Sequence, residues 1–309
     1  MANRSMTKLA SIDVGTNSVL LLIAEVDPQG KITPLHDEAR ITRLGEGFGK
    51  DKMLKPEAME RTFEVLKRYV DLAKSYKVSE IRAVGTSALR DAENKEVFLN
   101  RVKSELDLSI EVISGEREAW LTYRACVLAF PKLTGKTLML DIGGGSTEFI
   151  FGDREHLEQM VSLNIGSVRA TEMFLHSDPI REREFQNLHS YLQDKIRPVL
   201  NSHKKNLSHL IGVAGTVTTL AAMDLEIVRY NPSLIHGFRL TRGRLDQLLD
   251  KMKKMTLVER KKLPGLDPGR ADVIVAGGVI LKVVLEETGL EEVIVSDWGI
   301  RHGLLESKI

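Results

Sequence analysis

The sequence predicts an α/β protein built from two similar halves. A loop pattern occurs twice, as Ile12-Asp13-Val14-Gly15-Thr16-Asn17-Ser18 and, 128 positions later, as Leu140-Asp141-Ile142-Gly143-Gly144-Gly145-Ser146. Each copy follows an apolar run that ends in an aspartate, turns through small residues and continues into a second β-prone run, 19–23 or 147–151. Two hairpins of the same kind indicate two similar half-molecules.

The small residues of both loops suit the binding of phosphate. A tetrahedral phosphate needs several backbone N–H donors that point inward, and a Cβ at the turn blocks its close approach. Hydroxyl donors also occur in both patterns, at Thr16, Ser18, Ser146 and Thr147. An ordinary glycine-rich hairpin explains either loop alone, but the pair favours two tips that hold one phosphate group.

The composition predicts about two domains. The 309 residues are 42% hydrophobic, which is enough for a well-buried core. No apolar run approaches the roughly 20 residues needed to span a bilayer, and the N-terminus lacks a signal-peptide pattern, so we expect a cytoplasmic location. Cys126, the only cysteine, lies in an apolar segment that predicts a buried, unreactive thiol.

The charge balance argues against a nucleic-acid partner. Lys and Arg number 44 against 43 acidic residues, so the net charge is +1. Positive charge gathers between Arg239 and Arg270, where ten basic residues accompany four acidic ones. A solvated helix surface is the favoured explanation of this stretch, and guidance of a polyanion is the alternative.

The first half alternates helices and strands. A helix opens at Pro56, and its apolar residues recur every three or four positions. There follow a strand at 81–84, a turn at 85–87 into a segment with Arg90, a helix at 95–106, a strand at 110–113 and a helix at 116–130. The stretch 43–49 resembles a dinucleotide fingerprint, but its glycine spacing is wrong and no strand is expected before it, so we exclude a Rossmann site.

The second half repeats the order of elements. After a crossing at 131–135 we expect strands at 137–141, 147–151 and 160–164, helices at 168–176 and 180–202, and a strand at 210–214 that enters Gly215 and Thr216. A helix at 271–287, a strand at 293–295 and a helix at 297–306 complete it. We therefore expect an N-terminal domain of residues 1–130, to which 297–309 return, and a C-terminal domain of residues 131–296.

Six segments in order resemble one known family, the exopolyphosphatases and guanosine pentaphosphate phosphohydrolases (Ppx/GppA). They are Asp13 to Ser18, Gly85-Thr-Ser-Ala-Leu-Arg90, Ser114-Gly-Glu-Arg-Glu-Ala119, Asp141-Ile-Gly-Gly-Gly-Ser-Thr-Glu148, Ala214-Gly-Thr216 and Ser296-Asp-Trp-Gly299. The loop motif is shared with the wider actin, sugar kinase and Hsp70 superfamily. The segments that contain Arg90 and Glu118 narrow the resemblance to this family.

The resemblance implies two ribonuclease-H-like (actin-like ATPase) domains, with an active site in the cleft between them. It also implies removal of a terminal phosphate from a phosphoanhydride chain. Long family members add a helical C-terminal domain of the HD type, which this sequence lacks, so we expect a short form. Extended polyphosphate tracking and the family's dimer contacts depend on that domain, and a homodimer is therefore an open expectation.

The resemblance places the catalytic glutamate at Glu118, directly before the alanine of the Ser-Gly-x-x-Glu-Ala pattern. A carboxylate that accepts a proton from the attacking water fits a hydrolase. Glu116 lies about 200° away around a helix of 3.6 residues per turn, so the two side chains face different ways. The alternative role for either residue is an acid favoured at a helix start.

Two carboxylates beside the second loop predict a divalent metal. Asp141 and Glu148 next to a polyanion repel it by a few kcal/mol per close pair, and Mg²⁺ (or Mn²⁺) between them and the phosphate oxygens removes this conflict. A turn-capping acid and an exposed strand residue are the alternatives for these two residues.

Further phosphate contacts are expected from both halves. Arg90 can hold phosphate oxygens with two parallel hydrogen bonds, although a surface ion pair is the alternative. Gly215 and Thr216 open a helix and offer an anion-binding N-terminus, although close backbone packing explains the glycine almost as well. The remaining phosphate-binding candidates are Thr16, Asn17, Ser18, Gly143, Gly144, Gly145 and Ser146.

The leading hypothesis is a metal-dependent exopolyphosphatase that releases orthophosphate from inorganic polyphosphate by in-line attack of a water activated by Glu118. Hydrolysis of guanosine pentaphosphate to the tetraphosphate is the runner-up, because both substrates present the same terminal group. A superfamily kinase or ATPase and a non-catalytic protein that binds alarmone nucleotides are more distant alternatives. We expect polyphosphate or guanosine penta- and tetraphosphate as partners, and neither nucleic acid nor a membrane.

Overall fold

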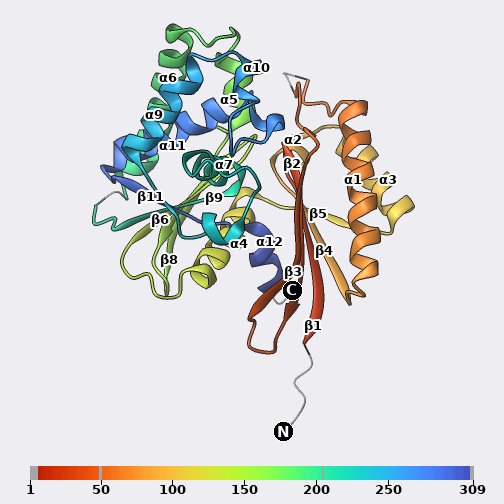
Figure 1. The fold of residues 1–309 in the computed structure, drawn as a ribbon. Helices are drawn as coiled ribbons and strands as arrows, with labels where there is room; N and C mark the ends of the chain where they lie inside the picture. The colour runs from red at the N-terminus through yellow and green to blue at the C-terminus, as the bar shows by residue number, and fades with distance from the viewer. Residues whose placement is uncertain (1–5, 49–50, 204, 307–309) are drawn as a thin grey trace. The chain divides into compact units, whose positions relative to one another are not determined.

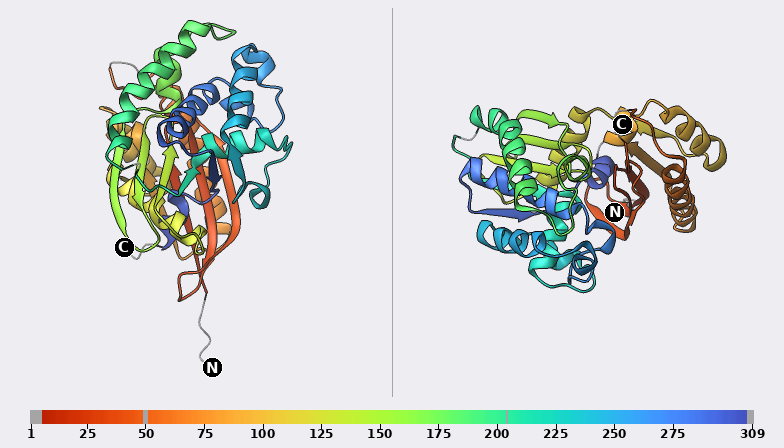
Figure 2. Two further views of the ribbon diagram at one scale, coloured as in Figure 1. Left: turned by 90° about the vertical axis from the view of Figure 1, so that its left-hand side faces the viewer. Right: turned by 90° about the horizontal axis from the view of Figure 1, so that it is seen from above.

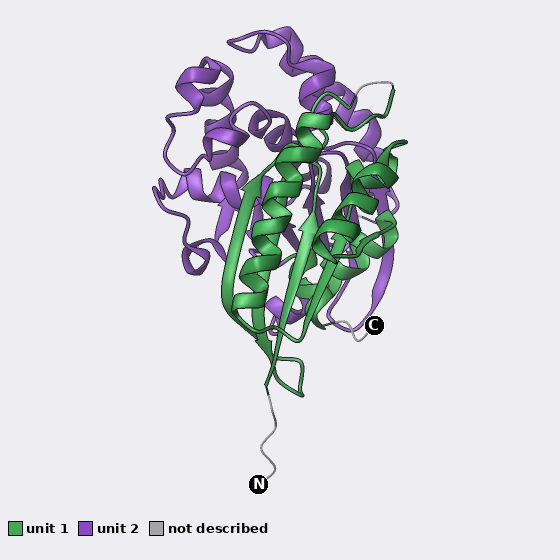
Figure 3. Cartoon of the chain, turned by 90° about the vertical axis from the view of Figure 1, so that its right-hand side faces the viewer, with its two compact units in different colours: residues 1–125, 299–309 green, residues 126–298 purple. Residues whose placement is uncertain are grey.

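The computed structural model describes residues 6–48, 51–203 and 205–306; Gly49 of the stretch 43–49 and residues 307–309 lie outside it. Contacts divide the chain into two units, residues 1–125 with 299–309 (unit 1) and residues 126–298 (unit 2) (Figure 3). Each unit is built on one mixed sheet with helices, which confirms the predicted α/β class. The expected boundary at residue 130 and the observed division at 125 both fall within or at the end of a single helix.

Unit 1 contains a five-stranded sheet in the order β3-β2-β1-β4-β5. Its strands are β1 (Thr7–Val14), β2 (Ser18–Val26), β3 (Ile32–Ile41), β4 (Glu80–Gly85) and β5 (Ile110–Val112). The hairpin β1–β2 and the pair β2–β3 are antiparallel, whereas β1, β4 and β5 are parallel. The segments that follow these three parallel strands therefore start at the same edge of the sheet.

The helices of unit 1 cover both faces of this sheet (Figure 1). They are α1 (Pro56–Ser75), α2 (Ser87–Asp91), α3 (Lys95–Leu106), most of α4 (Gly115–Ala129) and α12 (Ile300–Glu306). The predicted apolar stripe of α1 is buried at Phe63, Leu66 and Val70. On the other face α12 packs on β1 and β2, where the hydroxyl of Ser11 donates to the carbonyl oxygen of Arg301 at 2.9 Å.

Unit 2 repeats this topology with one additional strand. The order of its sheet is β10-β11-β9-β6-β7-β8, in which β6, β9 and β11 are parallel and correspond to β1, β4 and β5. The strands are β6 (Thr137–Ile142), β7 (Thr147–Gly152), β8 (Leu157–Leu163), β9 (His209–Val213), β10 (Arg239–Thr241) and β11 (Glu292–Val295). Two sheets of the same order confirm that the chain consists of two similar halves.

The helix α11 (Ile274–Thr288) is the centre of the helical layer of unit 2 (Figures 1 and 2). It packs against α5, α6, α7 and α9 and is buried along most of its length. The other helices are α5 (Ser167–Phe174), α6 (Glu182–Asn201), α7 (Ala214–Asp224), α8 (Pro232–Ile235), α9 (Arg242–Lys253), α10 (Leu257–Arg260) and the 3₁₀ turn η1 (Pro268–Arg270).

One expectation about the first half of the chain is wrong. The statement that no strand precedes the stretch 43–49 is wrong, since β3 ends at Ile41. The strand escaped notice because it is an edge strand with mostly exposed residues and a proline, Pro34, which only edge strands accept readily. Cys126 is buried as expected, and burial, with a smaller effect of the Asp141 charge, raises the pKa of its thiol.

Among the described residues, no helix has the length and apolar character needed to cross a membrane.

Candidate active site

The two predicted loops have the same geometry. In the first, the N–H of Gly15 donates to the carbonyl oxygen of Ser18 at 3.0 Å, and in the second Gly143 donates to Ser146, also at 3.0 Å. The flanking strands keep the same register in both hairpins, so every position of one loop has a counterpart 128 residues later in the other.

Both loops contain N–H groups that no acceptor uses. Between described residues, the backbone N–H groups of Thr16 and Asn17 in unit 1 and of Gly144, Gly145 and Ser146 in unit 2 donate no hydrogen bond. The side chains of Thr16 and Asn17 are buried, and their Oγ1 and Nδ2 atoms also have no partner in the described part of the chain. Successive free donors in a turn form a concave site for an anion. Each loop can therefore hold phosphate oxygens.

The sheet edge of unit 1 brings three predicted segments together. The N–H of Thr86 donates to the carbonyl oxygen of Val14 at 3.2 Å, and that of Ile113 donates to Gly85 at 3.0 Å. The loop 15–18, the helix α2 with Arg90 and the start of α4 with Glu118 consequently follow three adjacent strand ends. Residues that are far apart in the sequence, such as Gly15 and Glu118, thus lie at one edge of the sheet.

Arg90 and Glu118 form an ion pair at this edge. Nη1 of Arg90 donates to Oε2 of Glu118 at 2.9 Å and to the carbonyl oxygen of Ile113 at 3.1 Å. The side chain of Glu118 is 6% exposed and that of Arg90 is 23% exposed. Glu116 is exposed instead, and hydrogen bonds from its own N–H and from Ser114 lower the pKa of its carboxyl group. Of the two glutamates, only Glu118 is therefore buried next to Arg90.

The two predicted metal ligands lie opposite each other in unit 2. Asp141 and Glu148 are register partners of the antiparallel pair β6–β7, so their side chains share one face of the sheet. Both are buried, and Oε1 of Glu148 accepts a hydrogen bond from Ser162 at 2.8 Å. In unit 1 the residue opposite Asp13 is Leu20, so only the second hairpin contains a carboxylate pair.

The donor set in unit 2 fits Mg²⁺ rather than a metal held by protein alone. The described residues contain no group of three or more His, Cys, Asp or Glu side chains that could hold a metal ion. Mg²⁺ is commonly bound by one or two carboxylates, with waters and substrate phosphate as the other ligands. Two adjacent carboxylates beside a loop with free N–H groups satisfy this requirement.

The start of α7 contains the last predicted pair, Gly215 and Thr216. It is contacted by Arg270, which the sequence analysis did not select as a site residue. A Cβ atom at Gly215 would overlap the guanidinium group of Arg270, so this side chain lies directly on the backbone of Gly215. Burial lowers the pKa of Arg270 from its usual value. Oγ1 of Thr216 donates to the carbonyl oxygen of Ile142 at 3.3 Å, which links α7 to the second loop. Ala214 has a positive φ of 65°, a strained conformation of the kind that is frequent at functional sites.

Arg270 was visible in the sequence only as one of ten basic residues between 239 and 270. Its position depends on η1, which follows the buried turn at Leu266 and leads into α11. No sequence spacing indicated that this arginine would meet a glycine 55 positions earlier.

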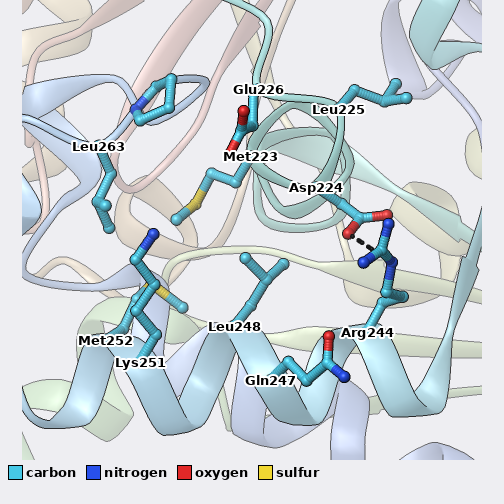
Figure 4. A pocket seen from close by; sticks show the side chains of 11 residues that line it. Met223, Asp224, Leu225, Glu226, Arg244, Gln247, Leu248, Lys251, Met252 and Leu263 are labelled. Atoms are coloured by element: carbon cyan, nitrogen blue, oxygen red, sulfur yellow. Dashed lines mark ion pairs between the residues drawn. The ribbon is translucent and has the colours of Figure 1, made fainter.

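A pocket of about 410 Å³ lies at the other end of α7 (Figure 4). Met223, Asp224 and Leu225 line one side of it, and the residues of α9 line the opposite side, among them Arg244 and Lys251. Arg244 approaches Asp224 at 3.3 Å, so this arginine of the basic stretch is neutralised within the unit. Gly215 and Asp224 are nine positions apart on α7, which at 1.5 Å per residue separates Gly215 from this pocket by roughly 14 Å. The pocket is therefore distinct from the start of α7 with Gly215.

Comparison with known proteins identifies the family of the chain. Residues 22–309 match the Ppx/GppA phosphatase family. The chain belongs to this family. This Ppx/GppA protein is 34% identical over 313 residues to exopolyphosphatase 2 of Mycobacterium tuberculosis. The match covers 97% of this chain and 98% of that protein. It is also 38% identical over 298 residues to a bifunctional 3-dehydroquinate synthase/phosphatase of Fusobacterium nucleatum, but spans only 44% of that protein's length.

Solved structures of Ppx/GppA proteins have the same fold. The family member of Aquifex aeolicus is 38% identical and covers 98% of this chain, with 97% of its own chain covered and a TM-score of 0.82. An exopolyphosphatase of Cytophaga hutchinsonii is 30% identical, with 96% of each chain covered and a TM-score of 0.89. These relatives confirm the predicted family and two-domain fold, and with them the predicted enzyme class, a phosphoanhydride hydrolase.

Proposed function

We propose that this Ppx/GppA protein is a metal-dependent exopolyphosphatase in which Glu118 activates the attacking water. The observation that supports this role best is the buried Glu118 carboxylate, which the Arg90 guanidinium holds at 2.9 Å at the sheet edge next to the first loop. A carboxylate in such a position accepts the proton of a water as the water oxygen attacks the terminal phosphorus. The P–O bond of the anhydride breaks, orthophosphate leaves, and the polyphosphate chain is one unit shorter.

The loops and Arg90 are proposed to hold the terminal phosphate group. The free N–H groups of Gly144, Gly145 and Ser146 are donors that need no rearrangement when charge develops on the phosphate oxygens. Arg90 uses Nη1 for Glu118 and Ile113, and neither of these hydrogen bonds occupies its Nε or Nη2 atom. Positioning and electrostatic stabilisation of this kind provide most of the catalysis of phosphoryl transfer. The expectation that one substrate takes groups from both units stays a prediction.

Asp141 and Glu148 would hold the metal ion. When bound, Mg²⁺ or Mn²⁺ supplies neutralisation of the phosphate charge and a fixed geometry for the transferring group. The pairing of these two carboxylates across β6 and β7, with no equivalent pair in unit 1, supports a single metal site in unit 2.

The preferred substrate in this proposal is inorganic polyphosphate, because the mycobacterial relative that matches over nearly its full length is an exopolyphosphatase. Guanosine pentaphosphate presents the same terminal group and is the alternative. The test is release of orthophosphate from each purified substrate, with and without a chelator. We expect rapid release of orthophosphate from long-chain polyphosphate, and we expect the chelator to stop it. Conversion of the pentaphosphate alone, with polyphosphate left intact, would refute the substrate assignment.

A cytoplasmic location is part of the proposal, and a homodimer stays an open expectation. Membership in a phosphatase family argues against the kinase and the non-catalytic alternatives. Orthophosphate release without any acceptor alcohol is the property that separates a hydrolase from a kinase.

A further inference from the structure

The carbonyl groups of the first loop are fixed by backbone donors. In unit 1 the N–H groups of Thr42 and Arg43 donate to the carbonyl oxygen of Asn17 at 3.0 and 2.9 Å, and the N–H of Gly45 donates to that of Thr16 at 2.9 Å. The segment 42–45 directly follows β3, the third strand of the unit. It therefore holds the loop from the side opposite to the free N–H groups.

The corresponding segment of unit 2 is the start of α5, which follows the third strand β8. The N–H of Ser167 donates to the carbonyl oxygen of Gly143 at 2.9 Å, and the N–H groups of Val168 and Arg169 donate to Gly144 at 2.9 and 3.2 Å. The first N–H groups of a helix have no partner within it, and here the loop carbonyls satisfy three of them. A Cβ at Gly166 would overlap the carbonyl oxygen of Gly144, so the approach is as close as glycine permits.

At Gly145 the two units differ in the kind of donor that holds the loop carbonyl. Its counterpart, Asn17, accepts two backbone hydrogen bonds, whereas the carbonyl oxygen of Gly145 accepts one from the side chain of Arg169, through Nε at 3.1 Å. Backbone donors beyond the first turn of α5 are used within the helix, so none is left for Gly145. A guanidinium group thus replaces the backbone donors of the other unit.

We propose that Arg169 is a positioning residue for phosphate binding and hydrolysis, and that it acts through the peptide group of Gly145 and Ser146. The carbonyl and the N–H of a trans peptide point in opposite directions. The bond from Arg169 to the carbonyl oxygen therefore aims the N–H of Ser146 away from α5, on the side where the loop donors are free. The consequence for catalysis depends on the proposed function, but the orientation of the loop does not.

The test combines kinetics with amide NMR. Arg169→Ala is expected to lower the kcat of orthophosphate release by about tenfold or more, since loss of one oriented donor to a transition-state oxyanion costs on the order of 10² to 10³. The KM is expected to change little, because the rest of a polyphosphate chain binds elsewhere. Ethylguanidinium in the assay should restore part of the activity, which a loss of folding would not allow. Arg183→Ala, at an exposed arginine on α6, is the control and should behave as the wild type.

The NMR experiment titrates inorganic phosphate and follows the amide signals of Ser146 and Asn17. In the wild type both signals should shift. In Arg169→Ala and in the milder Arg169→Lys, the shift of Ser146 should be reduced, whereas that of Asn17, held by backbone donors, should stay. Equal Ser146 shifts in all variants, or a lower kcat that ethylguanidinium does not restore in a folded variant, would overturn the inference. Normal phosphate shifts in a wild-type protein that hydrolyses neither substrate would instead refute the proposed function alone.

Discussion

Nη1 of Arg90 lies 2.9 Å from Oε2 of Glu118, and both side chains belong to unit 1 although 28 positions separate them. The guanidinium fixes the position of the carboxylate, which a residue that must accept a proton from one water requires. This pair connects the proposed base with the proposed phosphate ligand.

Substitution of Arg90 tests its two proposed roles, which are to hold Glu118 and to bind the terminal phosphate. Arg90→Met is expected to lower kcat/KM by about 10- to 100-fold, the equivalent of a hydrogen bond to a charged group of about 1.5–3 kcal/mol. Arg90→Lys keeps the charge but loses the planar fork, so it should restore only part of the activity. The measurement is steady-state phosphate release. If Arg90 acts only by holding Glu118, the double variant Arg90→Met/Glu118→Gln will be no slower than Glu118→Gln.

Substitution of Glu148 tests the metal site. Glu148→Gln keeps the shape of the side chain and the acceptor for Ser162, but removes one of the two negative charges. The Mg²⁺ concentration for half-maximal activity should rise by about tenfold or more. Glu155→Gln, in the exposed turn before β8, is the control and should leave the metal dependence unchanged. An unchanged metal dependence in Glu148→Gln would remove this residue from the ligand set.

A methyl group at Gly215 should reduce activity without a large loss of stability. It would displace the guanidinium of Arg270. Because this group is the flexible end of a side chain and can move, the substitution changes the position of the positive charge more than the stability of the fold. We expect kcat/KM of Gly215→Ala to fall while the midpoint of thermal unfolding changes by only a few degrees. In Gly243→Ala, on α9, the new Cβ meets no atom within 4 Å, and this control should be neutral or more stable. Wild-type kinetics in Gly215→Ala would argue against the idea that the position of the Arg270 guanidinium matters for activity.

The stability of unit 2 should fall in mild acid because of His236. Burial is the main cause that lowers the pKa of His236 below 6.5, while the Asp297 charge and a hydrogen bond with Ala129 oppose it. Between the two pKa values the unfolded chain binds more protons than the folded one, so stability is retained above pH 6.5 and declines as the pH falls below it. His236→Phe preserves the stacking on Phe130 and should weaken this pH dependence of the unfolding midpoint. His156→Phe replaces an exposed histidine and should leave the pH dependence of the unfolding midpoint unchanged.

The sequence predicted the features that are local or repeated. The twin hairpins follow from apolar runs, small turn residues and their recurrence. Helix geometry predicted that Glu116 and Glu118 face different ways, but the choice of Glu118 came from the family resemblance. The edge strand β3 lacks a buried face over most of its length, and its pattern therefore resembled a loop.

The supporting residues of the site were beyond sequence reasoning for a different reason. Arg169 and Arg270 meet the loop and Gly215 only because β8, η1 and α11 place them there. Nothing in their local sequence distinguishes them from solvated arginines. Partners of this kind depend on tertiary packing, which single-sequence patterns do not encode.

The most direct measurement is kcat for orthophosphate release from polyphosphate by Glu118→Gln, with Glu116→Gln as the matched control and substrate binding measured separately. A general base at Glu118 predicts that kcat falls by about 10²- to 10⁴-fold while the substrate still binds. Glu116→Gln, on the exposed side of α4, should keep the wild-type rate. A wild-type rate in Glu118→Gln, or an equal loss in both variants, would contradict the assignment of Glu118 as the base.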